Sequence, residues 1–403
     1  MMGHGLSIGD RVRYHRKRRS LSQTVLANRV GRSESWLSQV ERGNRPIVKL
    51  NDLIALGEVL RVDLVELTGQ PYRLIPDGGG EHPVVAPLRA ALLTYDAFGI
   101  SDDVPPPSVG DLTAKVERTQ RMWYTVRRPF SAVAPSLPEL LVDAQAAVRA
   151  TSGDEQRRAW AAACHTYHLM RVVLKRLGEF DLGMLAGDRA MLAAQYAEDP
   201  LLVALSAFRL SHVLCAAGHP QQAHDLAMDA TALLDPLDRA DRGHTSMRGA
   251  LELAAAWAAT CRHDDATAWR RLRVASDAAD RLGGDDTILW VIFGPTNVAI
   301  HGVVICAELG EPAEALRRAE HVEVAPVPTQ ERRFSFFIGL ARAHSQLRED
   351  YATLWALLKA ERNSPEDLRY HPFAREMIRD LLRRDRRTIR EELHGLADRA
   401  GVR

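Results

Sequence analysis

Short helix–helix turns recur along most of this 403-residue chain, and they constrain its fold more than any other feature. From Leu112 onward the sequence is built from Ala, Leu and Arg, with few β-branched runs and no strand-like alternation. Turn sequences recur at Gly178, Gly218, His263, Gly310 and Arg348, at spacings of 40, 45, 47 and 38 residues. A repeat of this period predicts helix pairs that stack into an α-solenoid.

A small side chain follows each turn, five residues after the positions named above. These side chains are Gly183, Ala223, Ala268, Ala315 and Thr353. Small residues let the second helix of a pair approach the first closely, because the distance between packed helices depends on the side chains at the contact. The pattern resembles the tetratricopeptide repeat, with units longer than the usual ~34 residues. The resemblance implies a superhelix whose concave face is lined by the first helix of each pair and serves for binding.

The N-terminal 67 residues carry the start and stop signals of five short helices. Ser7, Ser22 and Ser33 are predicted N-caps, and Gly31 and Gly43 can adopt the left-handed conformation that ends a helix. The expected helices run over 7–19, 23–30, 34–42, 48–60 and 62–67. We therefore expect a compact five-helix bundle at this end of the chain.

Within this bundle, the segment LSQTVLANRVGRSESWLSQVERGNRP resembles the lambda-repressor-like, xenobiotic-response-element (XRE) family of helix-turn-helix proteins. The matching features include Ser22-Gln23, the turn at Gly31 and the closing Glu41-Arg42-Gly43. In that family the second helix of the pair enters the major groove of DNA. Val25 is a departure, because the family often has Glu there to complete a capping box.

The resemblance implies DNA-binding roles for nine residues. Glu34, Ser35 and Gln39 would face base edges, Ser33 would cap their helix, Trp36 would lie against sugar or a thymine methyl, and Arg11, Gln23, Arg42 and Asn44 would contact the backbone. Two alternatives stay open. Glu34 could instead stabilise the N-terminal end of its helix, and the serines could cap a bundle that binds protein rather than DNA.

Charge is distributed unevenly along the chain. Residues 1–67 hold twelve Lys and Arg against seven Asp and Glu, a net charge of +5, whereas the whole chain carries +1. A basic module joined to a mildly acidic body is typical of a protein in which one part contacts phosphates and the other does not. We therefore expect double-stranded DNA as a partner.

A Gly- and Pro-rich stretch from Gly69 to Pro87 marks the boundary between the two parts. Its Gly78–Gly80 run is interpreted as a hinge, since no strand precedes it and no Lys-Ser or Lys-Thr follows it, as a phosphate loop would require. A short helix is expected over 88–98. The predicted protein is all-α: a lambda-repressor-like DNA-binding domain (1–70), a linker (71–111) and a tetratricopeptide-like α-solenoid (112–403) for sensing and dimerisation.

The predicted concave face is rich in cations, hydrogen-bonding groups and aromatic rings. Counting back from the turns gives the candidate effector-binding residues His165, His168, Arg176, Phe208, His212, Trp257, Asn297 and Arg342. This mixture suits a peptide or an acidic small molecule. The alternative is that these residues form a solvated helix face and that Trp257 belongs to the core.

A helix-turn-helix joined to such repeats resembles actinobacterial and peptide-sensing regulators of Gram-positive bacteria. The resemblance implies a homodimeric transcription regulator whose effector, a peptide or a small molecule, modulates DNA binding. The alternative is a constitutive DNA-binding protein whose repeats dock a protein partner.

The sequence does not indicate an enzyme, a metal-binding protein or a membrane protein. The sequence contains no GxSxG, HExxH, Walker or dinucleotide motif, and the His263-Asp264-Asp265 run has no further ligand at a supporting spacing, so we expect no enzyme, metal or cofactor. The four cysteines, Cys164, Cys215, Cys261 and Cys306, lack CxxC pairing and are interpreted as reduced core residues. Since no apolar run approaches ~18 residues and no leader is evident, we expect a cytoplasmic protein without a membrane span.

Overall fold

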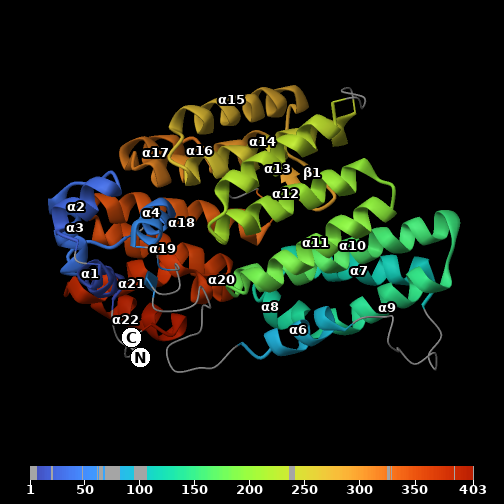
Figure 1. Cartoon of the computed structure of the whole chain (residues 1–403), viewed down its shortest axis with the longest axis horizontal. Coiled ribbons are helices and arrows are strands. Elements are labelled where there is room, and N and C mark those ends of the chain that lie inside the picture. Colours follow the sequence, from blue (N-terminus) through green and yellow to red (C-terminus); the bar gives the residue numbers. More distant parts are fainter. Residues whose placement is uncertain are drawn as a thin grey trace.

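The computed structural model describes residues 7–19, 21–47, 49–60, 62, 67–68, 82–94, 107–235, 241–324, 327, 329–384 and 386–402. Over these residues the regular structure is helical apart from one short hairpin, which confirms the all-α prediction. Figure 1 shows a small group of N-terminal helices at one end of an elongated stack of paired helices. No helix in the described ranges is long and apolar enough to cross a membrane.

The first four helices form a small unit that we call the N-terminal bundle. They are α1 (Ile8–Arg18), α2 (Gln23–Arg29), α3 (Glu34–Glu41) and α4 (Leu50–Leu60). The predicted caps are confirmed, because the hydroxyls of Ser7, Ser22 and Ser33 accept hydrogen bonds from backbone N–H groups three residues ahead at 3.1–3.2 Å. The expected fifth helix lies mostly outside the described residues.

The remaining helices form one continuous unit, the helical body. It begins with α6 (Val85–Leu93), α7 (Val109–Thr125), α8 (Pro129–Val133), the short 3-10 turn Ala134–Ser136 and α9 (Leu137–Ala150). Five antiparallel pairs follow: α10 (Gly153–Arg176) with α11 (Phe180–Tyr196), α12 (Pro200–Ala216) with α13 (Pro220–Leu233), α14 (Arg242–Cys261) with α15 (Asp265–Leu282), α16 (Pro295–Leu309) with α17 (Pro312–Ala319), and α18 (Gln330–Leu347) with α19 (Asp350–Asn363). The chain ends in α20 (Pro365–Tyr370), α21 (Pro372–Arg384) and α22 (Arg390–Ala400).

Every turn predicted from the repeat separates the two helices of one pair. The five turn residues Gly178, Gly218, His263, Gly310 and Arg348 all have positive φ, at 79°, 89°, 60°, 85° and 61°. The small residues five positions later are all buried, as expected for the closest approach of two helices. The repeat period therefore has a structural cause: one left-handed residue ends each first helix.

A β-hairpin interrupts the helices between α15 and α16, in a part of the chain where the sequence shows no strand-like alternation. Strand β1 (Asp286–Ile288) pairs antiparallel with β2 (Val291–Phe293). Three residues per strand are too few for a periodic signal in sequence. The hairpin packs on α14 through Phe293, whose ring covers Gly249 so closely that a Cβ there would lie 1.9 Å from the ring.

The helix expected over 88–98 is found as α6, and it packs into the body rather than lying free between two domains. Val85, Leu88 and Leu92 are buried in the same hydrophobic cluster as the first repeat helices. The packed body therefore reaches back to residue 85, and the Gly78–Gly80 run interpreted as a hinge lies outside the described residues. The four cysteines are buried and unpaired with one another by disulfides, as predicted.

The N-terminal bundle is docked on the end of the body where the helix–helix turns lie. A single hydrophobic cluster joins its core to Ala223, Ala258 and Phe373 of the body. Polar contacts add to this: the buried Asn51 amide donates to the Thr260 carbonyl, and the Arg348 Nη2 donates to the Asn44 carbonyl at 3.1 Å. Figure 1 shows the blue N-terminal bundle beside the orange and red helices α18 and α21.

Candidate DNA-binding surface and ligand groove

A buried ion pair holds α3 in the N-terminal bundle. Arg16 of α1 donates to Glu41 of α3 through Nε and Nη2, at 2.5 and 2.8 Å, and Glu41 is only 2% exposed. Gln23 of α2 donates to the same carboxylate at 2.8 Å. The hydrogen bond to Glu41 raises the pKa of Arg16 above its ordinary value. Since one carboxylate joins three helices, the orientation of α3 within the bundle is fixed.

This pair was not predicted from the sequence. Glu41 belongs to the helix-turn-helix motif, but it also follows Leu37 by four positions and so lies on the inward face of its helix. An acidic residue on a buried face requires a partner, and that requirement was the available signal.

One face of α3 is open to solvent. Glu34 and Ser35 are exposed at its N-terminal end, just after the capping Ser33, and Arg42 is exposed at its other end. The Thr24 hydroxyl donates to the Glu34 carboxylate at 2.8 Å, which orients that side chain. Three predicted DNA-binding residues are thus presented on one accessible surface.

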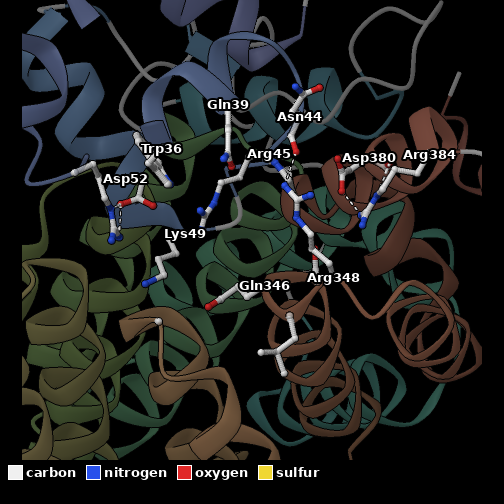
Figure 2. A pocket seen from close by; sticks show the side chains of 15 residues that line it. Trp36, Gln39, Asn44, Arg45, Lys49, Asp52, Gln346, Arg348, Asp380 and Arg384 are labelled. Carbon is white, nitrogen blue, oxygen red and sulfur yellow. Dashed lines mark hydrogen bonds and ion pairs between the residues drawn. The ribbon is translucent and has the colours of Figure 1, made fainter. Parts of the chain in front are cut away.

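Of the other predicted DNA-binding residues, Ser33 and Asn44 are also exposed, whereas Arg11, Gln23, Trp36 and Gln39 are partly or fully covered. Trp36 is 7% and Arg11 is 8% exposed, while Gln23 is held by Glu41. Trp36 and Gln39 line a cavity between the N-terminal bundle and the helical body, which we call the junction cavity (Figure 2). In this arrangement α3 offers only part of its surface, and contact of Trp36 or Gln39 with DNA would require the bundle to move away from the body.

On the helical body, two adjoining pockets of about 260 and 110 Å³ form what we call the groove. Six residues line both: Lys175, Arg176, His212, His301, Glu331 and Arg332. They come from α10, α12, α16 and α18, which are first helices of their pairs. The groove therefore lies among first helices of four of the pairs.

Six of the eight predicted effector residues line the groove: Arg176, Phe208, His212, Trp257, Asn297 and Arg342. The other two are used in helix packing. A ring nitrogen of His165 lies 3.1 Å from the Gln120 amide of α7, and the fully buried His168 lies 3.0 Å from the Ser206 hydroxyl. Helix α7 packs against the first repeat helix at His165. Counting residues back from the turns could not predict this contact, because α7 precedes the repeats.

Most of the groove cations are paired. Arg176 contacts Asp367 at 2.8 Å and Glu331 at 2.5 Å, and Glu331 also contacts Arg332 at 3.0 Å. Although burial raises it, Arg332 and Arg176 together hold the pKa of Glu331 well below its ordinary value. The buried Arg342 pairs with Glu308 and lies over the ring of Phe373. These pairs join α10, α16, α18 and the chain after α19 around the groove.

Lys175 is the exception, because it makes no hydrogen bond or ion pair with any described residue. Burial, with Arg176 and Arg171 nearby, lowers its pKa to about 7. Of the residues that the structure describes, four cationic side chains and two anionic ones line the larger pocket. This excess favours a ligand that carries negative charge.

The groove histidines act as neutral groups. Burial lowers the pKa of both His301 and His371 to about 3, and it lowers that of His212 well below the ordinary value. His371 and Phe373 lie at the start of α21, outside the repeats, and the sequence analysis did not identify them. No group of three or more His, Cys, Asp or Glu side chains that could hold a metal occurs among the described residues.

The comparison with known proteins identifies the N-terminal domain. Residues 7–68 match the family described as helix-turn-helix domain, which confirms the prediction for this part of the chain. No curated protein matches the chain. Among solved structures, the chain is similar to the crystal structure of Bacillus thuringiensis PlcR in complex with the peptide PapR7 and DNA, at 12% sequence identity and a TM-score of 0.32, over 86% of this chain and 99% of that one.

Proposed function

We propose that this protein is a homodimeric, sequence-specific transcription regulator of the cytoplasm whose groove binds an anionic effector, either a peptide or a small molecule. The helix-turn-helix domain at residues 7–68 supports DNA binding. The observation that carries the proposal is the presentation of α3, which is capped by Ser33, held by the Arg16–Glu41 pair and exposed at Glu34 and Ser35.

The recognition of DNA bases by α3 is tested by substituting residues on this helix. We expect Gln39→Ala to relax the preference at one base position, by roughly 1–3 kcal/mol per half-site, because a glutamine amide can bond an adenine edge in two places. Mobility-shift titrations on duplexes selected by the full chain from a random pool measure this. Gln195→Ala, on an exposed position of α11, is the matched control. Unchanged base preference in both Gln39→Ala and Ser35→Ala would contradict this orientation of α3.

Effector binding in the groove is supported by the six predicted residues that line it and by its excess of cations. Native mass spectrometry of the protein purified from its own host would detect a retained ligand. We expect Lys175→Met to lose that ligand, because Lys175 has no partner within the described chain and is free to meet an anion. Lys359→Met, on α19, should retain it.

Lys175 is a better test residue than Arg342 or Asn297. Arg342 is paired with the buried Glu308, and the Asn297 amide donates to the Ile292 carbonyl of β2 at 2.7 Å. Removing either side chain would disturb the fold as well as the groove. Equal ligand retention in wild type and Lys175→Met would argue against the groove as the effector site.

A dimer is proposed because a single helix-turn-helix domain makes too few contacts for tight, specific binding, and such domains usually read paired half-sites. Light scattering on the full chain should report twice the mass of one chain. A monomer that nevertheless binds its selected duplex tightly would contradict this part of the proposal.

A further inference from the structure

The junction cavity has a composition unlike that of a simple contact between two parts of a protein. Its volume is about 610 Å³, which is in the range of small-molecule sites. Its cationic side chains are Arg32, Arg45, Lys49, Arg348 and Arg384. Among the described residues, the acids that line it are Asp52 and Asp380, so positive charge is in excess there.

Both acids already have partners. Arg32 contacts Asp52 at 2.8 Å, and Arg384 pairs with Asp380. Neither acid is therefore left as a dedicated counterion for Arg45 and Lys49.

Lys49 is nearly enclosed, at 9% exposure, yet it makes no hydrogen bond or ion pair with the part of the chain that the structure describes. Its ammonium lies against Gly310, at the carbonyl end of α16. A Cβ added to Gly310 would lie only 2.1 Å from the Lys49 Nζ. That helix end carries a partial negative charge that offsets only part of the loss of hydration. Burial, with Arg32 close by, lowers the pKa of Lys49 to about 8, so the group is still mainly charged at neutral pH.

Arg45 and Arg348 lie at the exposed side of the same cavity. Arg45 also has no bonded partner among the described residues, and partial loss of hydration, with Arg32 and Arg348 nearby, lowers its pKa. In Figure 2, Gln39 and Arg45 extend from the N-terminal bundle toward the space above Gln346 and Arg348 of the body. Cations from both parts of the protein thus face one polar space.

We propose that the junction cavity binds a compact polyanion carrying phosphate or carboxylate groups, held by Lys49, Arg45 and Arg348, and that this anion and DNA exclude each other. A double helix is too large for the cavity, since its major groove alone is about 12 Å wide. The anion would supply the missing counterions and bridge the bundle to the body. It would therefore favour the docked arrangement, in which Trp36 and Gln39 are covered. The exclusion of DNA rests on the function proposed above, whereas the anion site does not.

The anion site is tested by isothermal titration of inorganic pyrophosphate and, separately, citrate into the full chain, with sodium chloride at matched ionic strength as the reference. We expect at least one of the two to bind, and the tighter one identifies the class. Lys49→Met and Arg45→Gln should each weaken that binding by about tenfold or more, whereas Lys359→Met should not. Arg45 is exposed, so Arg45→Gln keeps the test valid if Lys49→Met fails to fold.

Two results would overturn the site. One is the absence of binding by both anions. The other is binding that Lys175→Met abolishes but Lys49→Met and Arg45→Gln leave intact, because that would assign the anion to the groove.

Exclusion is tested by the ratio of DNA affinities with and without the bound anion. For the wild type we expect a fall of about tenfold, and for Arg45→Gln a ratio near one. Anion binding through Lys49 with no change in DNA affinity would contradict exclusion. If the full chain selects no duplex at all, the proposed DNA function fails, while the titrations with Lys49→Met still decide the anion site.

Discussion

The groove and the junction cavity are both basic, but they are built in different ways. The groove is enclosed by helices of a single packed body, and pairs such as Arg176–Asp367 and Arg342–Glu308 connect its walls. The walls of the junction cavity belong to two parts of the chain that meet through few polar contacts, among them Asn51 with Thr260 and Arg348 with Asn44. The groove is preorganised, whereas the junction cavity exists only while the N-terminal bundle is docked. A ligand in the groove can act on the body directly, but a ligand in the junction cavity acts on docking.

The largest expected effect comes from breaking a groove pair. We expect Glu308→Ala to lower the free energy of unfolding by about 3–5 kcal/mol, because it leaves the buried Arg342 without its counterion. Urea unfolding of the full chain, followed by circular dichroism, measures the change. Glu314→Ala is the control: its pairs with Arg317 and Arg318 lie at the surface, where water screens them, and its loss should leave stability nearly unchanged.

Equal losses in Glu308→Ala and Glu314→Ala would mean that the groove walls are not fixed by their ion pairs. The distinction between the two cavities would then disappear.

The second prediction concerns acid. His301 and His371 have a pKa of about 3 in the folded protein, below the ordinary value of ~6.5, so the unfolded chain binds more protons between these values. Stability should be full above about pH 6.5 and fall as pH decreases, by up to ~1.4 kcal/mol per pH unit for each histidine. Thermal melts of wild type and a His301→Gln, His371→Gln double variant between pH 6.5 and 5 measure this. A slope that is the same in both proteins would contradict neutral histidines in the groove.

The third prediction concerns the contact between the N-terminal bundle and the helical body. Asn51→Ala removes a buried amide that donates to the Thr260 carbonyl across the contact, and we expect docking to weaken by about 1–1.5 kcal/mol. DNA affinity should therefore rise, by up to about tenfold, since α3 is uncovered more often. Asn363→Ala removes a similar bond to the Lys359 carbonyl within α19 and should leave DNA affinity unchanged. A rise in both variants, or in neither, would show that docking does not control access to α3.

The smallest expected effect concerns the turns. His263 has a φ of 60°, in the left-handed region that costs a non-glycine residue roughly 1–2 kcal/mol, whereas three of the other four turns use glycine. We expect His263→Gly to change the free energy of unfolding by no more than about 1 kcal/mol, because the relief of backbone strain and the added entropy of the unfolded chain oppose each other. Differential scanning calorimetry resolves the sign. A loss above that size would mean that His263 makes a stabilising contact of its own.

The features that the sequence predicted are those that neighbouring residues determine. Serine caps and left-handed turn residues depend on a few adjacent positions, and from the turns the helical period placed residues such as Phe208 and Trp257 in the groove. The Arg16–Glu41 pair joins residues 25 positions apart, and the Arg348–Asn44 contact joins residues 304 positions apart. Such contacts follow from how whole elements pack, as does the covering of His165 by α7. The junction cavity was therefore outside the reach of local patterns.

Each cavity contains a native chromophore. Trp36 lines the junction cavity, with the Arg32 guanidinium 5.6 Å from its ring centroid, and Trp257 lines the groove. Indole emission shifts to longer wavelength when water reaches the ring, and a nearby cation changes its intensity. Undocking of the bundle should therefore shift the emission of Trp36 toward the red, while occupation of the groove should alter that of Trp257. With either tryptophan replaced by phenylalanine, the difference spectrum would follow one event at a time in the same intact chain.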